Sequence, residues 1–108
     1  MGDVIYTFNV YWTDQMKIDF LQRVILIHSY AYYQLDRTKW TDRKYDKVSK
    51  QLVRLQSQYN REWIKEKTQY GYVFYDFDGT TGFDLWDRLN SQDKIFISNL
   101  AVRMVQGR

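Results

Sequence analysis

The sequence predicts an α+β fold made of an antiparallel helical hairpin, a C-terminal helix and a small β-sheet. Residues 4–12 alternate in the manner of a strand, two long stretches repeat apolar residues at helical spacing, and residues 70–75 are rich in aromatic and β-branched side chains. The 108 residues suit a single domain, 1–108, with the hairpin over about 14–59 and a strand, turn and helix over about 70–106.

The first expected element is a strand over residues 4–12, and a helix over about 14–36 follows it. Alternate positions of the strand hold Val4, Tyr6, Phe8, Val10 and Trp12. Thr13 is a suitable N-cap for the helix. Two adjacent stripes run along the helix, one of Phe20, Val24, Ile27, Ala31 and Leu35, the other of Leu21, Ile25, His28 and Tyr32. So wide an apolar face predicts the most buried helix of the fold.

The second helix of the hairpin begins after Thr41, with Asp42 in its first turn, where a carboxylate suits the helix dipole. Its packing stripe consists of Tyr45, Val48, Leu52, Leu55 and Tyr59. About half a turn away lies a basic stripe, formed by Arg43, Lys47, Lys50 and Arg54. One side of the helix is therefore expected to pack and the other to face solvent. Residues 59–67 either continue this helix or form a short one of their own.

The C-terminal part of the chain is expected to form a strand, a turn and a helix. Residues 70–75 suit a strand that pairs with the first one, and residues 78–82 have the composition of a turn. Ser91 then caps a helix over about 92–106. Its inward face is predicted to hold Ile95, Phe96, Leu100, Ala101 and Met104.

The composition restricts the compartment and the chemistry. The sequence has no cysteine, so it offers neither a disulfide nor a thiolate metal site, and no metal site is predicted. Residues 1–12 lack the basic and apolar regions of a signal peptide, and the apolar run 24–27 is far shorter than the ~20 residues that span a bilayer. We therefore expect a cytoplasmic protein without a membrane partner.

The positive charge is concentrated in the middle of the chain. The net charge is +3, yet residues 36–67 alone carry ten basic and five acidic side chains. The basic stripe suits a phosphate backbone, which makes nucleic acid a possible partner, and it equally suits an acidic protein surface. Asp46, Glu62 and Glu66 interrupt the positive field, and a solvated helix face explains the stripe as well.

The join between the two long helices carries a motif. Tyr30, Ala31, Tyr32 and Tyr33 are followed after two residues by Asp36, and Asp42 is followed after two residues by Tyr45 and Asp46. This pattern resembles the N-terminal helical domain, of Ia type, of NAD-dependent DNA ligases, over about residues 21–55. The chain is also similar to short ligase-related proteins of phages and prophages, which join such a hairpin to an aromatic strand, an Asp-Gly turn and a closing helix.

The resemblance implies a site for the nicotinamide mononucleotide half of NAD, formed by Tyr32, Tyr33, Asp42, Tyr45 and Asp46. A tyrosine face can stack on a cationic pyridinium ring, and carboxylates can accept hydrogen bonds from ribose hydroxyls. Two departures stand out, because Tyr33 occupies a position that is usually His in the ligases and residues 37–40 lack the usual proline. A purely structural hairpin signature is the alternative, since Tyr45 also lies on the packing stripe.

Two catalytic motifs are incomplete. The ligase nucleophile is a Lys two residues before Asp-Gly, but here Asp76 holds that position before Asp78-Gly79, which excludes covalent adenylation by the family's route. Residues 73–80 resemble the first motif of haloacid-dehalogenase-type phosphatases, in which Asp76 would attack phosphorus and Asp78 would be the general acid beside magnesium. That chemistry needs a parallel-sheet scaffold, and only 28 residues follow Thr80, so we interpret Asp76–Thr80 as a turn. His28, the single histidine, lies midway along a broadly apolar helix, and we interpret it as a core residue.

The resemblance to phage proteins, together with the incomplete catalytic motifs, predicts a non-catalytic accessory protein that acts by binding. Its expected target is a host protein in the host cytoplasm, as for an inhibitor of a bacterial immune nuclease (an anti-CRISPR) or another anti-defence protein. Tyr32, Tyr33, Tyr45 and the basic stripe are the expected contacts. The alternative is a nicotinamide-nucleotide binding protein that uses the hairpin residues. No cofactor is required, although NAD or nicotinamide mononucleotide is a possible ligand.

Overall fold

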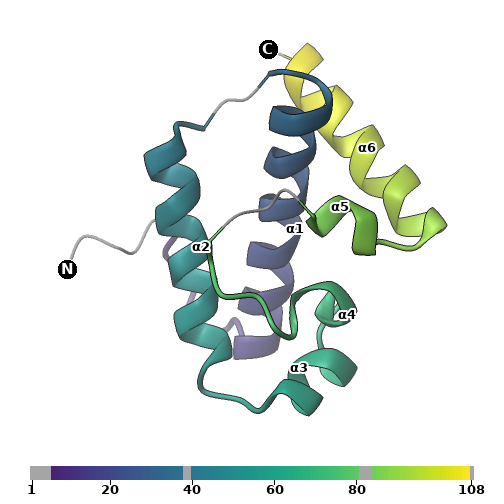
Figure 1. Cartoon of the computed structure of the whole chain (residues 1–108). Coiled ribbons are helices and arrows are strands. Elements are labelled where there is room, and N and C mark those ends of the chain that lie inside the picture. Colours follow the sequence, from purple (N-terminus) through teal and green to yellow (C-terminus); the bar gives the residue numbers. More distant parts are fainter. Residues whose placement is uncertain (1–5, 38–39, 81–83, 108) are drawn as a thin grey trace.

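The computed structural model describes residues 6–37, 40–80 and 84–107 (Figure 1). Its elements are α1 (Asp14–Gln34), α2 (Asp42–Gln56), α3 (Arg61–Lys67), α4 (Gly71–Phe74), α5 (Leu85–Arg88) and α6 (Ser91–Gln106). These described ranges contain helices and connecting segments but no β-strand, so the predicted α+β class with a small sheet is wrong and the fold is all-α. None of the described helices combines the length and the apolar character needed to cross a membrane.

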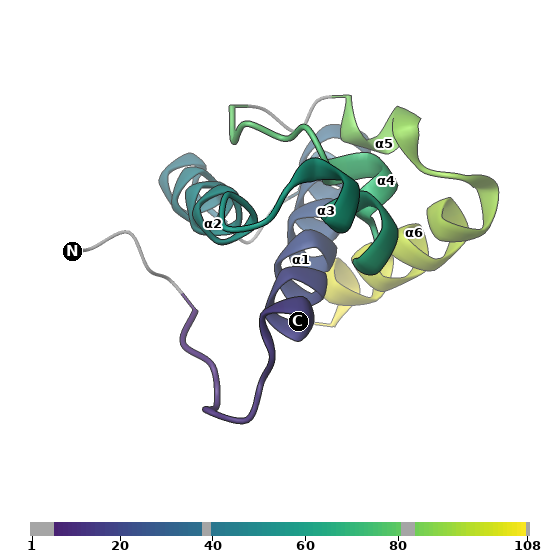
Figure 2. The same ribbon diagram turned by 90° about the horizontal axis from the view of Figure 1, so that it is seen from below.

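The long helix α1 lies at the centre of the fold, as its wide apolar face predicts. The hairpin prediction is confirmed, because α2 runs antiparallel to α1 on one side, and α6 packs on another side (Figure 1, Figure 2). The helices α3 and α4 pack together near the end at which α1 begins. The buried core between these helices includes Ile18, Leu21, Ile25, Val48, Leu52, Ile64 and Ile97.

Capping side chains determine where the long helices begin. Thr13 and Thr41 cap α1 and α2 as expected, each accepting a hydrogen bond from the backbone N–H three residues further on, at 3.2 and 3.0 Å. The cap of α6 is Asn90 at 2.8 Å, so this helix begins at Ser91, one residue earlier than expected. At the other end of α1, Asp36 has a φ of 53°, in the left-handed region, beyond the last helical residue.

The described part of the expected first strand, residues 6–12, is an irregular segment on the helices. The Tyr6 N–H donates to Gln51 Oε1 at 3.2 Å, and Gln51 Nε2 donates to the Tyr6 carbonyl at 2.8 Å. A glutamine of α2 therefore satisfies the backbone groups that a partner strand would pair with. The rings of Tyr6, Phe8 and Trp12 pack around Phe20 of α1. Val4, the first residue of the expected strand, lies outside the described residues.

The expected second strand, residues 70–75, contains the short helix α4 instead. The Phe74 N–H donates to the Tyr70 carbonyl at 3.1 Å, and the Tyr75 N–H donates to the Gly71 carbonyl at 2.9 Å. Tyr70, Val73 and Phe74 are fully buried at a spacing of three and four residues, which a helix places on one face. Before it, residues 61–67 form the separate helix α3, which resolves the alternative that the sequence left open.

The inward face of α6 differs from the predicted one. Ile97 and Ala101, four residues apart, are fully buried, whereas 62% of Ile95 and 45% of Phe96 is exposed. Leu100 and Met104 are partly buried. Ile95 and Phe96 were therefore assigned to the wrong face, because α6 turns the stripe that contains Ile97 toward the core.

Candidate functional site

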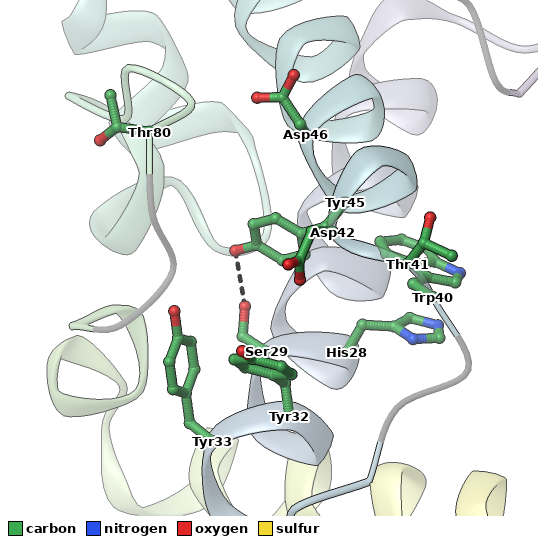
Figure 3. Close-up of a pocket in the computed structure, with 10 residues that line it drawn as sticks. All are labelled: His28, Ser29, Tyr32, Tyr33, Trp40, Thr41, Asp42, Tyr45, Asp46 and Thr80. Carbon is green, nitrogen blue, oxygen red and sulfur yellow. Dashed lines mark hydrogen bonds between the residues drawn. The ribbon is translucent and has the colours of Figure 1, made fainter.

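A pocket lies between the C-terminal half of α1 and the first two turns of α2 (Figure 3). Its volume is about 370 Å³, within the usual range for small-molecule sites. The described residues that line it are His28, Ser29, Tyr32, Tyr33, Trp40, Thr41, Asp42, Tyr45, Asp46 and Thr80. All five residues of the predicted ligand site are among them. The structure therefore brings Tyr32, Tyr33, Asp42, Tyr45 and Asp46 together around one pocket, while their role in binding stays a prediction.

Helical spacing explains why these side chains converge. Ser29, Tyr32 and Tyr33 are separated by three and four residues on α1, so they share the face that looks toward α2. Asp42 and Asp46 are four residues apart on α2, so they lie one helical turn apart on the same side of the helix, along the pocket wall. Because α1 and α2 are antiparallel, the C-terminal part of α1 lies opposite the first turns of α2, and the two sets of side chains meet.

One wall of the pocket consists of the rings of His28, Trp40 and Tyr45. The imidazole of His28 lies 3.7 Å from the ring centre of Trp40, at an interplanar angle of 8°. Tyr45 meets Trp40 edge to face, with ring centres 6.3 Å apart. Trp40 precedes the N-cap Thr41 and Tyr45 is the fourth helical residue, so the two rings form the hydrophobic staple that fixes how a chain enters a helix. The three rings give the pocket a rigid, apolar side.

Tyr45 has a fixed hydroxyl group. Its Oη lies 2.8 Å from the hydroxyl of Ser29, which joins α2 to α1 across the pocket (Figure 3). Burial raises the pKa of the Tyr45 hydroxyl above its ordinary value, and the hydrogen bond with Ser29 opposes part of that rise. Tyr45 therefore stays protonated at physiological pH and presents a neutral ring to the pocket.

Tyr32 and Tyr33 stand at the mouth of the pocket. Their rings meet edge to face at 4.8 Å, and 49% of Tyr32 and 41% of Tyr33 is exposed. Both rings project from α1 toward the space below Asp42 in Figure 3. Exposed tyrosine rings of this kind offer apolar area to a ligand at a low cost in side-chain entropy.

The two carboxylates of the pocket are exposed and lie on α2. Asp42 occupies the first turn of the helix, and Asp46 lies 3.2 Å from the ammonium group of Lys50. An exposed helical ion pair of this type contributes about 0.5 kcal/mol or less, so Asp46 keeps most of its capacity to meet a ligand. The pocket thus combines aromatic rings with negative charge, a combination that favours cationic aromatic compounds.

The basic stripe lies along α2, outside the described lining of the pocket. Arg43, Lys50 and Arg54 are exposed and Lys47 is partly buried. Lys50 is engaged with Asp46. The role of this stripe in partner or nucleic-acid binding stays a prediction.

The phosphatase-like motif forms a turn, as its composition predicts. The Asp76 carboxylate accepts a hydrogen bond from Arg88 at 2.7 Å, and Arg88 also donates to the Val73 carbonyl at 3.0 Å. Asp78 accepts from the hydroxyl and backbone N–H of Thr80, at 2.8 and 3.1 Å, and the hydroxyl bond is the larger cause of the lowered pKa of Asp78. Within the described ranges, no group of three acidic or histidine side chains is placed to hold a metal ion.

Sequence reasoning missed several lining residues. Trp40 was recognisable as half of a hydrophobic staple, because it directly precedes the cap Thr41 and lies five residues before Tyr45. Thr80 gave no such signal. It reaches the pocket because the turn before it packs on α2, where a Cβ on Gly79 would lie 3.2 Å from Val53 Cγ2.

An all-helical fold with an aromatic and acidic pocket in its hairpin defines the class: a helical domain with a pocket of small-molecule size. Residues 12–67, just over half of the chain, match the family described as DNA ligase-like, N-terminal NAD⁺-binding domain. The chain belongs to this family, which confirms the resemblance seen in the sequence. Neither a curated protein nor a solved structure gives a significant match.

Proposed function

We propose that this chain is a binding protein for nicotinamide-type ligands, which it holds in the pocket between α1 and α2. One observation carries the proposal: the five residues that the motif singles out come from two helices and line one pocket of ligand size. Membership of a family named for NAD⁺ binding supports the same conclusion. The pocket residues lie within the matched segment, with the exception of Thr80.

Each side chain has a role that follows from its position. Tyr32 and Tyr33 are half-exposed and line the same pocket as the stacked rings of His28 and Trp40, so they offer aromatic surface to a planar ring bound there. Asp42 and Asp46 face the same space and attract a pyridinium cation while accepting hydrogen bonds from ribose hydroxyls. Tyr45 is held by Ser29 and keeps the two helices at a fixed separation.

The proposal assigns binding and no catalysis to the residues described. The carboxylates of the phosphatase-like string are engaged with other side chains, Asp76 with Arg88 of α5 and Asp78 with Thr80 of the same turn. Binding of a host protein by the exposed tyrosines and the basic stripe stays a prediction that rests on the resemblance to phage proteins. The convergence of the five hairpin residues on one pocket supports binding of a small molecule.

Isothermal titration calorimetry tests the proposal directly. We expect heat with NAD and with nicotinamide mononucleotide, and none with ADP-ribose, which lacks the nicotinamide ring. Asp46→Ala is expected to weaken binding about tenfold, because it removes a charged hydrogen-bond acceptor. Asp87→Ala, an exposed carboxylate on α5, is the matched control and should bind as the unchanged chain does. Equal heat with ADP-ribose, or none with any of the three, would refute the proposal.

A further inference from the structure

We infer that His28 couples ligand binding to protonation: the pocket binds a nicotinamide-type cation tightly when the imidazole is neutral and more weakly when the imidazole is charged. This inference rests on the proposed function and adds to it a residue that controls the binding of charged ligands. Three observations support it, namely the position of the imidazole in the pocket wall, its contact with Trp40 and the charged groups around the two rings.

His28 is held in the wall of the pocket. It is the one histidine of the chain, and only 9% of it is exposed. Its ring lies 3.7 Å from the ring centre of Trp40 at an interplanar angle of 8°, so it cannot turn away from the pocket without breaking this stack (Figure 3). A charge that forms on His28 therefore forms in the wall of the proposed binding site.

The titratable and charged side chains around His28 come from both helices of the hairpin. Those that line the same pocket are Tyr32, Tyr33, Asp42, Tyr45 and Asp46. The ammonium group of Lys44 lies 5.4 Å from the ring centre of Trp40, and that of Lys50 lies 3.2 Å from Asp46. Aspartate ordinarily ionises at about pH 4, and tyrosine and lysine at about pH 10. Imidazole is therefore the type of side chain in this set that ordinarily changes charge between about pH 5 and pH 8.

Protonation of His28 and binding of a cation oppose each other. Each places a positive charge in or beside the same pocket of about 370 Å³, so the two charges are close neighbours. Two unit charges about 5 Å apart repel enough to weaken binding about fourfold in water, and more strongly at the lower effective dielectric of a partly buried site. We therefore expect protonation of His28 to weaken the binding of a pyridinium cation about tenfold. By linkage, the bound cation must make His28 harder to protonate by the same factor.

Proton NMR of the unaltered, untagged protein tests the inference. A single histidine gives a single imidazole Cε1–H resonance, so its chemical shift against pH reports on His28 alone. Saturating nicotinamide riboside, which is a cation, should move the midpoint of this titration down by about one pH unit, the equivalent of a tenfold effect. Nicotinamide has the same ring without the positive charge and should leave the midpoint in place.

Calorimetry with nicotinamide riboside gives a second readout. The dissociation constant should rise toward about ten times its initial value as the pH falls from about 8 to about 5. His28→Phe keeps an aromatic ring beside Trp40 without an ionisable group, and its dissociation constant should change less than about twofold over this interval. Tyr11→Phe, at an exposed position outside the pocket, is the control and should keep the pH dependence of the unchanged chain.

The outcomes separate this inference from the proposed function. Riboside binding that leaves the His28 midpoint in place or moves it to higher pH overturns the inference while the proposed function stands. The same holds for a pH dependence that His28→Phe retains in full. Failure of the riboside to bind at any pH between about 5 and 8 removes the proposed function as well.

Discussion

At the scale of single residues, a close backbone approach occurs at Gly71, where α4 begins. A Cβ at this position would lie 1.9 Å from the Ile64 carbonyl oxygen and 2.7 Å from Thr68 Oγ1. Because the first of these is a backbone atom, the clash can be relieved only by moving α3 away from α4. The approach lets Tyr70, Val73 and Phe74 enter the core directly after α3.

We therefore predict that Gly71→Ala lowers the free energy of unfolding by about 3 kcal/mol, an overpacking effect. Urea denaturation followed by circular dichroism measures it. Gln69→Ala is the matched control, because that side chain is exposed two residues earlier, and its effect should stay within about 0.5 kcal/mol. Equal stability of the two variants would contradict the described approach.

A second prediction concerns the alkaline limit of stability. Burial, and next the hydrogen bond to Asp93, raises the pKa of Tyr72 from 10.0 to about 12. A folded-state pKa above the unfolded one contributes stability that is present below pH 10 and is lost as the pH rises toward 12. The unfolding free energy of the chain should fall over this interval. Tyr72→Phe should lower it by about 1 kcal/mol at pH 7 through the lost hydrogen bonds.

The pH dependence of the free energy of unfolding shows whether Tyr72 causes the loss of stability. Tyr72→Phe should show a shallower loss of stability between pH 10 and pH 12 than the unchanged chain. Tyr11→Phe, at an exposed position, should follow the unchanged chain. If the free energy of unfolding fell equally with pH in all three proteins, the ionisation of Tyr72 would not be the cause of the loss.

The sequence also indicated which side chains come together in the hairpin. The resemblance to the ligase domain singled out Tyr32, Tyr33, Asp42, Tyr45 and Asp46, and all five line one pocket, while their role in binding stays a prediction. Thr80 could not be named, since its place at the pocket depends on how a distant turn packs on α2.

At the scale of elements, the two short aromatic segments 6–12 and 70–75 were wrongly predicted to be strands. The aromatic and β-branched composition of residues 70–75 suits a strand, yet Tyr70, Val73 and Phe74 have the spacing of one helix face. Over only six residues, the period of a helix and the period of a strand are hard to distinguish. The segment 6–12 alternates as a strand does, but α2 offers it a glutamine side chain in place of a partner strand. The long helices, with several turns of regular spacing, were predicted correctly.

Gln22 links the elements through buried hydrogen bonds. Its Nε2 donates to Gln56 Oε1 and to Thr68 Oγ1, both at 3.0 Å, and its Oε1 accepts from the Tyr70 N–H at 3.0 Å. One side chain of α1 thereby binds α2 and the segment between α3 and α4. We predict that Gln22→Met, which roughly conserves volume, costs about 3 kcal/mol because it leaves buried partners unsatisfied.

Chemical denaturation measures this cost, and Gln15→Met provides the control. Gln15 lies on the same helix but is exposed, so its replacement should change the unfolding free energy by less than about 0.5 kcal/mol. A cost for Gln22→Met as small as that of the control would show that the network contributes no stability.

The face of α6 gives another prediction at this scale. Ile97→Ala removes a fully buried side chain and should lower the free energy of unfolding by about 3 kcal/mol. Ile95→Ala, two residues away on the exposed face, should cost about 0.5 kcal/mol or less. Thermal denaturation ranks the two variants, and the reverse order would restore the inward face that the sequence predicted.

At the scale of the whole molecule, α1 organises the fold. It contacts α2, α5 and α6, so different faces of α1 pack against different helices (Figure 2). The hairpin was predictable because its helices are joined by a short connection. The positions of the shorter helices α3 to α5 depend on contacts between residues far apart in the sequence, which local patterns do not encode. The pocket therefore lies in the part of the fold that the sequence determines most directly.

The central claim is that this hairpin pocket binds the nicotinamide ring of a cation, and intermolecular nuclear Overhauser effects test it most directly. With ¹³C-labelled protein and unlabelled nicotinamide riboside, we predict contacts from the pyridinium protons to the rings of Tyr32, Tyr33 and Tyr45, all of which line the pocket. Contacts confined to residues elsewhere, such as Ile95 and Phe96 on α6, or no contacts at saturating riboside, would contradict the account.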